Sequence, residues 1–395
     1  MPIPLLLVSD APTAGTGLGR ITRDLATRIH ANLPEFRVGT LGYGGPITRK
    51  LGFQMYPMEM RDWVLFNLPD VWEDFAGKER GIVMTIWDAS RLLWFARPEN
   101  CNDTPLRKFL TNPPFERHGY FPMDATGPNN KLTAILKHTI DAYDRVLAYS
   151  KWAEEILKRS LEPTDLDWRP HGIDTSVFRP QNYKVARHRF GERINAKNNK
   201  GKPMSIPDDA FMIGIVATNQ TRKDFGLGIQ AAAELQKERN VVLWIHTDEL
   251  ERHWSLPALI YDYGFDHDKC VITCNMPFTD EQMSWCYSAA DVTLGIGGGE
   301  GFGYPIFESL ACGTPCIHGN YGGAPEHMEE YMLVKPVNTR LEGVYSSVRP
   351  LYDPKDWVAA IRALPKRTGT SLLPAHLDWN NLWGSWADWF RAGVK

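Results

Sequence analysis

A glycine-rich stretch with a glutamate on each side of its turn is the part of this sequence most suggestive of chemistry. Residues 297–308 read Gly-Gly-Gly-Glu-Gly-Phe-Gly-Tyr-Pro-Ile-Phe-Glu, with Glu300 before the turn and Glu308 after it. Glycines leave backbone N–H groups accessible, and such groups at the start of a helix attract anions. Carboxylates accept hydrogen bonds from vicinal hydroxyls. The stretch therefore predicts a loop that holds a phosphate and sugar hydroxyls together.

Two adjacent cations form a second candidate site. Arg222 and Lys223 follow the apolar run 211–216, which is typical of a buried strand. A guanidinium and an ammonium group at the carboxyl edge of a strand are well placed to neutralise a diphosphate. A solvated loop is the structural alternative.

The first strand of the chain also leads into a glycine loop. Residues 3–8 form a continuous apolar run, and Gly15, Gly17 and Gly19 precede a helical pattern. Because Arg20 stands where a third glycine would complete G-x-G-x-x-G, we favour a phosphate or substrate loop over a dinucleotide site. Trp87 and Asp88 follow the predicted strand 81–86 and are expected to project at the carboxyl edge of its sheet. Asp88 is thus a cleft candidate, and a helix cap is an equally good interpretation.

These candidates depend on an alternation of strands and helices in both halves of the chain. The pattern indicates an α/β protein with two Rossmann-like domains. Residues 97–130 break it, since prolines recur there, and we predict an ordered surface loop that serves as an acceptor wall. Tryptophans at helical spacing in residues 379–390 predict a packed helix rather than a sugar platform. Predicted strands are 3–8, 36–41, 53–56, 81–86, 145–149, 211–216, 241–245, 271–273, 292–294 and 314–317, and predicted helices include 132–143, 150–159, 227–235, 280–289 and 305–312.

Composition sets the class of protein. The chain has 395 residues, a net charge of −3 and 43% hydrophobic residues, which is ordinary for a globular protein of two domains. No apolar run is long enough to span a bilayer. Six scattered cysteines are too few for a disulfide scaffold, so we expect reduced thiols in core positions and a cytoplasmic protein.

One segment has a strong local charge. Residues 184–202 carry seven Lys or Arg against one Glu, so their net charge is 7 − 1 = +6 in a chain of net charge −3. We favour a solvated surface insertion over a phosphate-binding patch. The segment is nevertheless the only one that suggests a polyanionic partner.

Taken together, these motifs resemble those of a known family. The Glu300-Gly301-Phe302-Gly303…Glu308 pattern resembles the E-x7-E motif of GT-B-fold retaining glycosyltransferases, specifically glycosyltransferase family 4. Residues 171–178 resemble the segment between the family's two domains, and residues 221–223 resemble its diphosphate clamp. The resemblance is clear over most of residues 140–390 and looser at the first glycine loop.

The resemblance implies an architecture. It is a GT-B fold with an interdomain cleft, an acceptor domain over residues 1–175 and a nucleotide-sugar domain over residues 176–375. Residues 376–395 would form a C-terminal helix that packs back on the N-terminal domain.

The resemblance also implies a role for each site residue. Arg222 and Lys223 would bind the diphosphate of a nucleotide sugar, for which we expect a UDP-sugar such as UDP-glucose. Glu300 would bind the sugar hydroxyls and Glu308 the ribose hydroxyls. The remaining implied donor contacts are Gly17, Gly19, Gly301, Phe302 and Gly303.

Retaining members of the family are thought to transfer the sugar on one face, without a protein nucleophile or a metal ion. We therefore expect no cofactor and no metal, because the D-x-D spacings at 165–167 and 266–268 lie in linker-like stretches. One departure stands out: Trp87 occupies the usual histidine position, so Asp88 is expected to orient the acceptor.

The acceptor is open among small molecules, glycans, lipid-linked groups, proteins and a modified base in DNA. Two alternatives to a transferase remain. One is a GT-B-fold nucleotide-sugar epimerase or hydrolase, and the other is a non-catalytic nucleotide-sugar-binding protein.

Overall fold

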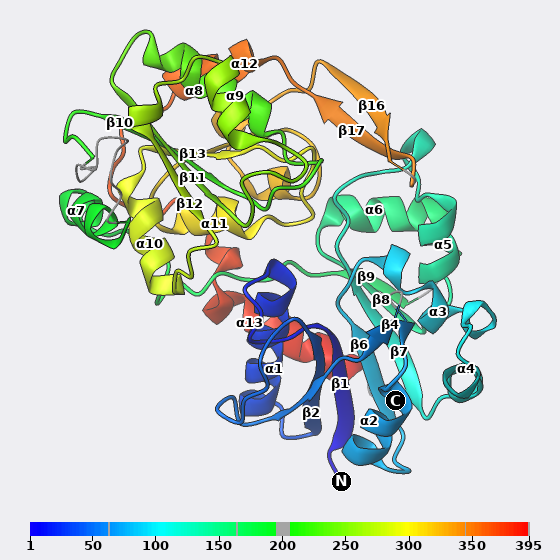
Figure 1. Ribbon diagram of the computed structural model, residues 1–395. Coiled ribbons are helices and arrows are strands. Elements are labelled where there is room, and N and C mark those ends of the chain that lie inside the picture. The colour runs from blue at the N-terminus through cyan, green and yellow to red at the C-terminus, as the bar shows by residue number, and fades with distance from the viewer. Residues whose placement is uncertain (62–63, 163–164, 195–205, 344, 394–395) are drawn as a thin grey trace. The chain divides into compact units, whose positions relative to one another are not determined.

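The computed structural model describes residues 1–61, 64–162, 165–194, 206–343 and 345–393 (Figure 1). The chain divides into two compact units. The first contains Met1–His171, Gly343–Ser347 and Trp383–Lys395, and the second contains Gly172–Glu342 and Val348–Leu382. The C-terminal helix α13 (Trp379–Ala392) therefore begins in the second unit and ends in the first.

The first unit is built on a parallel sheet whose strands follow the order β3-β2-β1-β6-β7-β8-β9. β1 lies inside this sheet, and its residues Leu5, Leu6 and Leu7 are fully buried, as expected for a strand covered on both faces. The strands are β1 (Ile3–Asp10), β2 (Phe36–Tyr43), β3 (Gln54–Pro57), β6 (Gly81–Thr85), β7 (Phe115–Phe121), β8 (Arg145–Ala148) and β9 (Asp165–Trp168).

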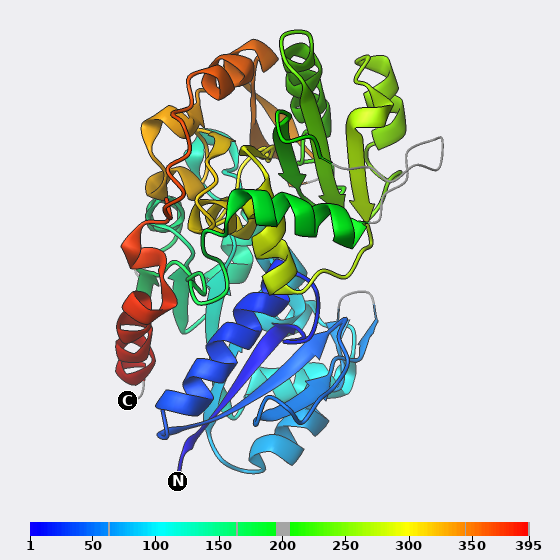
Figure 2. The same ribbon diagram turned by 90° about the vertical axis from the view of Figure 1, so that its left-hand side faces the viewer.

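Helices connect these strands. Figure 2 shows α1 (Gly17–Asn32) running along the sheet beside β1 and β2. Ser150 caps α6 (Lys151–Ser160) as the sequence predicts, because its hydroxyl accepts a hydrogen bond of 3.1 Å from the amide of Ala153. The other α-helices of this unit are α2 (Leu68–Ala76), α3 (Leu93–Ala96), α4 (Thr104–Thr111) and α5 (Ala134–Ile140).

The long loop predicted over residues 97–130 is wrong. The segment contains α4 and the strand β7, which pairs with β6 on one side and β8 on the other. Phe115, Tyr120 and Phe121 are at most 3% exposed, so they form core and not an acceptor wall. Prolines led to the wrong prediction because Pro113 and Pro114 lie just before the strand, where they remove no hydrogen bond between strands.

The second unit is built on a parallel sheet in the order β12-β11-β10-β13-β14-β15. α8 packs with α9 and α12, and α7 packs with α10 (Figure 1). Its strands are β10 (Phe211–Val216), β11 (Val241–Thr247), β12 (Cys270–Cys274), β13 (Val292–Gly295), β14 (Cys316–Gly319) and β15 (Leu333–Val334), and its helices are α7 (Tyr183–Ile194), α8 (Phe225–Gln236), α9 (Leu256–Asp262), α10 (Asp280–Ala289), α11 (Tyr304–Ala311) and α12 (Pro354–Arg362).

Two short two-stranded sheets complete the described fold, and the sequence patterns indicated neither. β4 (Met60–Arg61) pairs with β5 (Val64–Leu65), and β16 (Asn338–Glu342) pairs with β17 (Ser347–Leu351).

The C-terminal tryptophans, the cysteines and residues 165–167 were also subjects of sequence predictions. Trp379, Trp386 and Trp389 on α13 are at most 2% exposed, which fits a packing role. All six cysteines have free thiols. The prediction that residues 165–167 lie in a linker is wrong, since Asp165 belongs to the edge strand β9 and pairs with Arg145 at 2.9 Å.

Candidate active site

The candidate site lies where β10 and β13 end side by side in the second sheet. Backbone hydrogen bonds join the loops that follow these strands. The amide of Gly298 donates to the carbonyl of Arg222 at 2.7 Å, and the amide of Asp224 donates to the carbonyl of Ile296 at 2.8 Å. The fold thus brings the Arg222-Lys223 pair against the glycine loop.

A third segment, residues 322–323, contacts the glycine loop at Glu300. The amide of Gly323 donates to the carbonyl of Glu300 at 2.8 Å. Gly322 has a φ of +98°, and a Cβ there would lie 2.6 Å from the carbonyl oxygen of Glu300. Only glycine fits this close approach without strain. Gly303, with a φ of +89°, then precedes the first residue of α11.

The charged groups of the first two segments meet at one carboxylate. Glu300 Oε1 forms an ion pair with Lys223 Nζ and a second ion pair of 3.2 Å with Arg222 Nη1. The side chains of Glu300 and Lys223 are only 12% and 13% exposed. Two cations thus share one largely buried carboxylate oxygen, and an anionic ligand at this place would compete for them.

Lys223 and Glu300 border a cavity that opens to solvent. Lys223 and Glu300 supply its charged groups, and most of the remaining wall is apolar or backbone. A concave site with a few convergent polar groups is typical of ligand binding. The other lining residues include Ala217, Tyr287, Gly295, Gly303, Pro305 and Ile306.

Glu308 lies in α11, the helix that follows the glycine loop. It is 4% exposed, and its Oε2 accepts a hydrogen bond of 2.8 Å from the hydroxyl of Tyr287. Tyr287 itself lines the cavity. The second carboxylate of the motif is therefore held next to the cavity wall by a tyrosine that the sequence did not single out.

His318, at the end of β14, is a further buried group near the charges. Its Nδ1 lies 2.6 Å from the carbonyl oxygen of Gly295, so Nδ1 carries the hydrogen. Burial lowers the pKa of His318 to about 4, the Gly295 carbonyl opposes this shift, and the charge of Lys223 adds to it. The imidazole is therefore neutral near pH 7. A histidine directly after a predicted strand was the available signal in the sequence.

Arg349 is another group that the sequence did not indicate. It lies on β17, and its Nη1 donates to the carbonyl of Gly298 at 3.1 Å. The contacts of Arg349 could not be predicted from the sequence, because no motif marks the β16–β17 sheet.

The predicted site residues Gly17, Gly19 and Asp88 belong to the first unit. Gly17 and Gly19 lie in the first turn of α1, where the hydroxyl of Thr16 accepts a hydrogen bond of 3.0 Å from the amide of Gly19. Asp88 precedes a short 3-10 helix (Ala89–Arg91) but forms no side-chain cap bond to it, and pairs with Arg91 at 3.8 Å. Trp87 does not project at the sheet edge as expected, because its side chain is fully buried in the core.

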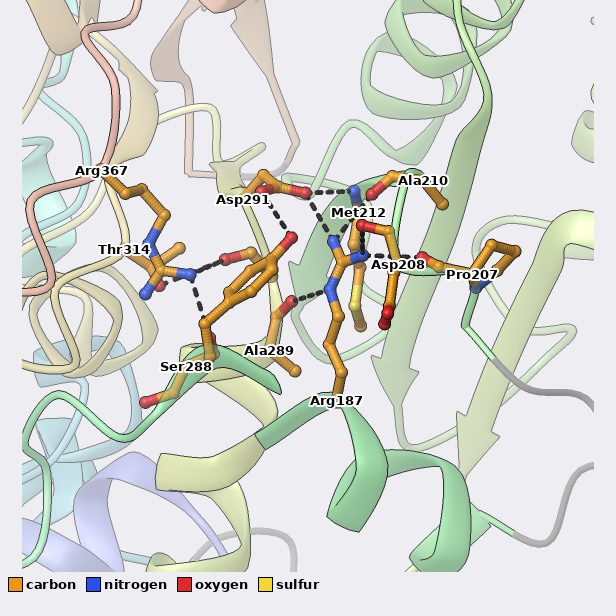
Figure 3. Close-up of polar contacts among 12 residues, drawn as sticks. Arg187, Pro207, Asp208, Ala210, Met212, Ser288, Ala289, Asp291, Thr314 and Arg367 are labelled. Atoms are coloured by element: carbon orange, nitrogen blue, oxygen red, sulfur yellow. Dashed lines mark hydrogen bonds and ion pairs between the residues drawn. The ribbon is translucent and has the colours of Figure 1, made fainter. Parts of the chain in front are cut away.

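Arg187, in the described part of the basic segment, has a structural role that the sequence did not predict. Arg187 is 3% exposed and lies at the centre of a network that joins three parts of the second unit (Figure 3). Its guanidinium donates at 2.8 Å to the carbonyls of Pro207 and Ala210 and to Asp291 Oδ2. Arg187 is therefore neither solvated nor available to a polyanion, while Lys197, Lys200 and Lys202 lie outside the described residues.

Within the described ranges, no three or more His, Cys, Asp or Glu side chains gather as a metal site would require. Among the described helices, none combines the length and the apolar character needed to cross a membrane.

Part of the second unit matches a model of a known sequence family. Residues 197–340, which contain all the site segments of the second unit except Arg349, match the model of the glycosyl transferases group 1. A D-inositol 3-phosphate glycosyltransferase of Mycobacteroides abscessus is 26% identical over 245 residues, which are 61% of this chain and 49% of that protein. One from Acidothermus cellulolyticus is 29% identical over 41% of this chain and 34% of that protein. The chain thus spans about half the length, or less, of these curated relatives.

Comparison with solved structures confirms the predicted GT-B fold. Sucrose-phosphate synthase from Thermosynechococcus elongatus matches with a TM-score of 0.69 and 16% identity, over 99% of this chain and 98% of that one. Anabaena HepE, solved in complex with UDP and glucose, matches with a TM-score of 0.70 and 12% identity, over 99% of this chain and all of the other. The resemblance to GT-B glycosyltransferases is thus confirmed for the fold and for the matched sequence segment, and membership of family 4 stays a prediction.

Proposed function

We propose that this chain, a protein of GT-B fold whose residues 197–340 match the model of the group 1 glycosyl transferases, transfers a sugar from a nucleotide-diphosphate sugar to a hydroxyl acceptor. The observation that carries the proposal is the convergence of Arg222 and Lys223 on Glu300, beside a cavity that Lys223 and Glu300 line. Two cations suit a diphosphate and the carboxylate suits sugar hydroxyls. A purely structural ion pair would not need to border a cavity.

A UDP-sugar is the donor we favour. Solved relatives of the fold contain UDP with glucose, or UDP-glucose. The cavity lies at the carboxyl edge of a parallel sheet, where α/β folds bind nucleotides. In this proposal Gly301, Phe302 and Gly303 contact the sugar or the β-phosphate, and Glu308 binds the ribose hydroxyls.

The proposed reaction retains the configuration of the sugar and proceeds on one face. The oxygen of the acceptor hydroxyl forms a bond to the anomeric carbon while the bond from that carbon to the phosphate oxygen breaks. The acceptor proton moves to the departing phosphate oxygen. Arg222 and Lys223 stabilise the negative charge that develops on the diphosphate, so the proposal requires neither a protein nucleophile nor a metal ion.

Residues of the first unit complete the proposal by resemblance alone. Gly17 and Gly19 are proposed to contact the donor phosphates, and Asp88 is proposed to orient the acceptor. The exposure of the Asp88 side chain, 49%, is compatible with contact to a ligand.

A modified base in DNA is the narrowest acceptor hypothesis. In the described part of the basic segment that motivated it, Arg187 is buried and the guanidinium carbon of Arg189 lies 3.7 Å from the centre of the Trp285 ring, whereas Lys184 and Arg193 are exposed. DNA as acceptor predicts donor turnover that DNA stimulates and that salt suppresses. Turnover with a small alcohol that salt does not affect would exclude it.

Incubation with UDP-, GDP- and ADP-sugars, with and without candidate acceptors, tests the whole proposal. We expect release of UDP and a glycosylated product that both depend on an acceptor. Release without any acceptor would instead indicate a hydrolase, and an altered sugar on intact nucleotide would indicate an epimerase. Tight binding without any turnover would indicate a non-catalytic binding protein.

A further inference from the structure

We infer that Arg349 is a positioning residue that holds the glycine loop in its donor-binding conformation. The inference rests on the proposed function. Arg349 lies on β17, is 11% exposed, and donates from Nη1 to the carbonyl of Gly298 at 3.1 Å. Its Nε also lies 3.4 Å from Glu342 Oε2 on β16.

The contact matters because it fixes the second of the two backbone polar groups of one residue in a run of three glycines. The amide of Gly298 is already bonded to the carbonyl of Arg222, as described above, so Arg349 holds its carbonyl. Glycines have more backbone conformations available than other residues, and a glycine run orders only where other groups restrain it. Glu300 lies two residues further on, and its position depends on this restraint.

The β17 strand is itself anchored close to the site. The hydroxyl of Tyr321 donates to the carbonyl of Val348 at 2.6 Å, and Tyr321 is next to Gly322, which packs on Glu300. Glu342 is bound by Arg349 at 3.4 Å and by Arg340 at 3.2 Å. The support of Arg349 is therefore built from both strands of the small sheet.

The family match ends at residue 340, inside β16, so Arg349 lies beyond it. Nothing in the matched motifs assigns this arginine a role. The contact is visible only in three dimensions, because 51 residues separate it from Gly298.

Steady-state kinetics with the donor tests the inference on a matched pair of variants, Arg349→Lys and Arg349→Met. Methionine keeps an unbranched stem but no donor, whereas lysine keeps a cation that can still bond to the Gly298 carbonyl. Because a bond from a charged donor typically changes affinity about tenfold or more, we expect the donor KM of Arg349→Met to rise about tenfold. Restraint of the free loop acts before chemistry, so kcat should change less than about threefold.

Arg340→Ala is the control. It removes the other cation bound to Glu342, at a side chain that is 53% exposed. Its donor KM should stay within about twofold of the wild-type value, and Arg349→Lys should lie closer to wild type than Arg349→Met does. The thermal midpoint of each variant checks that it is folded.

The inference is overturned if Arg349→Met and Arg340→Ala have the same donor KM, or if lysine and methionine act alike. It is also overturned if kcat falls while KM is unchanged. An inactive wild-type protein that binds no nucleotide sugar would instead refute the proposed function, so the two failures can be told apart.

Discussion

Replacing Glu300 by glutamine should separate sugar transfer from nucleotide binding. In the structure, its Oε1 is bound by both Lys223 and Arg222, the cations proposed to bind the diphosphate. Donor binding then requires both cations to exchange the carboxylate for phosphate oxygens. Glutamine keeps the shape of the side chain but removes the charge that competes for them.

The expected changes in UDP affinity and in kcat follow from these contacts. A hydrogen bond to a charged group contributes about 1.5–3 kcal/mol, and the partial exposure of Arg222, 26%, reduces its share. We therefore expect UDP to bind Glu300→Gln about as tightly as wild type, or up to about tenfold more tightly, since tenfold is about 1.4 kcal/mol. Loss of a group that stabilises the transition state should lower kcat by about 100-fold or more.

Calorimetric titration with UDP and steady-state assays with the UDP-sugar measure the two effects separately. Glu330→Gln, at an exposed position in the same unit, controls for the change in net charge. The reasoning would be refuted if UDP affinity and kcat fell by similar factors. That result would mean that Glu300 supports the diphosphate site instead of competing with it.

Three further predictions concern buried groups of the second unit. Glu308→Gln should weaken UDP binding about tenfold but leave binding of 2′,3′-dideoxy-UDP nearly unchanged, because only the former has ribose hydroxyls for the carboxylate to accept; equal losses in calorimetry would argue against this role. The pKa of His318 in the folded chain is about 4, below its ordinary value of 6.5. The free energy of unfolding is therefore highest above pH 6.5, and it falls by roughly 3 kcal/mol on account of this group as the pH falls toward 4. His318→Gln should therefore flatten the decline of unfolding free energy over that range, with the share of His327, whose pKa is also about 4, left in place; an unchanged slope in urea titrations would contradict it. Arg187→Met should lower the free energy of unfolding by about 3–5 kcal/mol, whereas Arg189→Ala at an exposed position should cost less than about 1 kcal/mol; similar losses would show that the network in Figure 3 is not a main source of stability.

Local signals explain which parts of the fold the sequence predicts well. The predicted bounds of β10 and α10 agree with the structure at both ends. β10 is a short buried apolar run, and α10 begins at a capping box in which Thr279 and Gln282 bond to each other's backbone. In both cases the deciding interactions lie within a few residues of the element.

Features that depend on distant partners were missed. β7 has a charged and aromatic sequence without strand alternation, and it is a strand because β6 and β8 pair with it on both sides. Arg187 looked like part of a charged surface, yet its carboxylate partner Asp291 is 104 residues away. The motifs of the site were predictable because their residues are adjacent in sequence, whereas their support by Arg349, Tyr287 and His318 comes from other elements.

The three-sided support of the glycine loop has a consequence for folding. Its hydrogen bonds join residue 298 to residue 222 and to residue 349, and residue 300 to residue 323, so the loop cannot be complete before all these segments are in place. Long-range contacts of this kind form late, after the entropy of closing the intervening chain has been lost. A chain emerging from the ribosome would acquire the site only after residue 349 has been added. Recovery of UDP binding during refolding should accordingly lag behind recovery of helical signal.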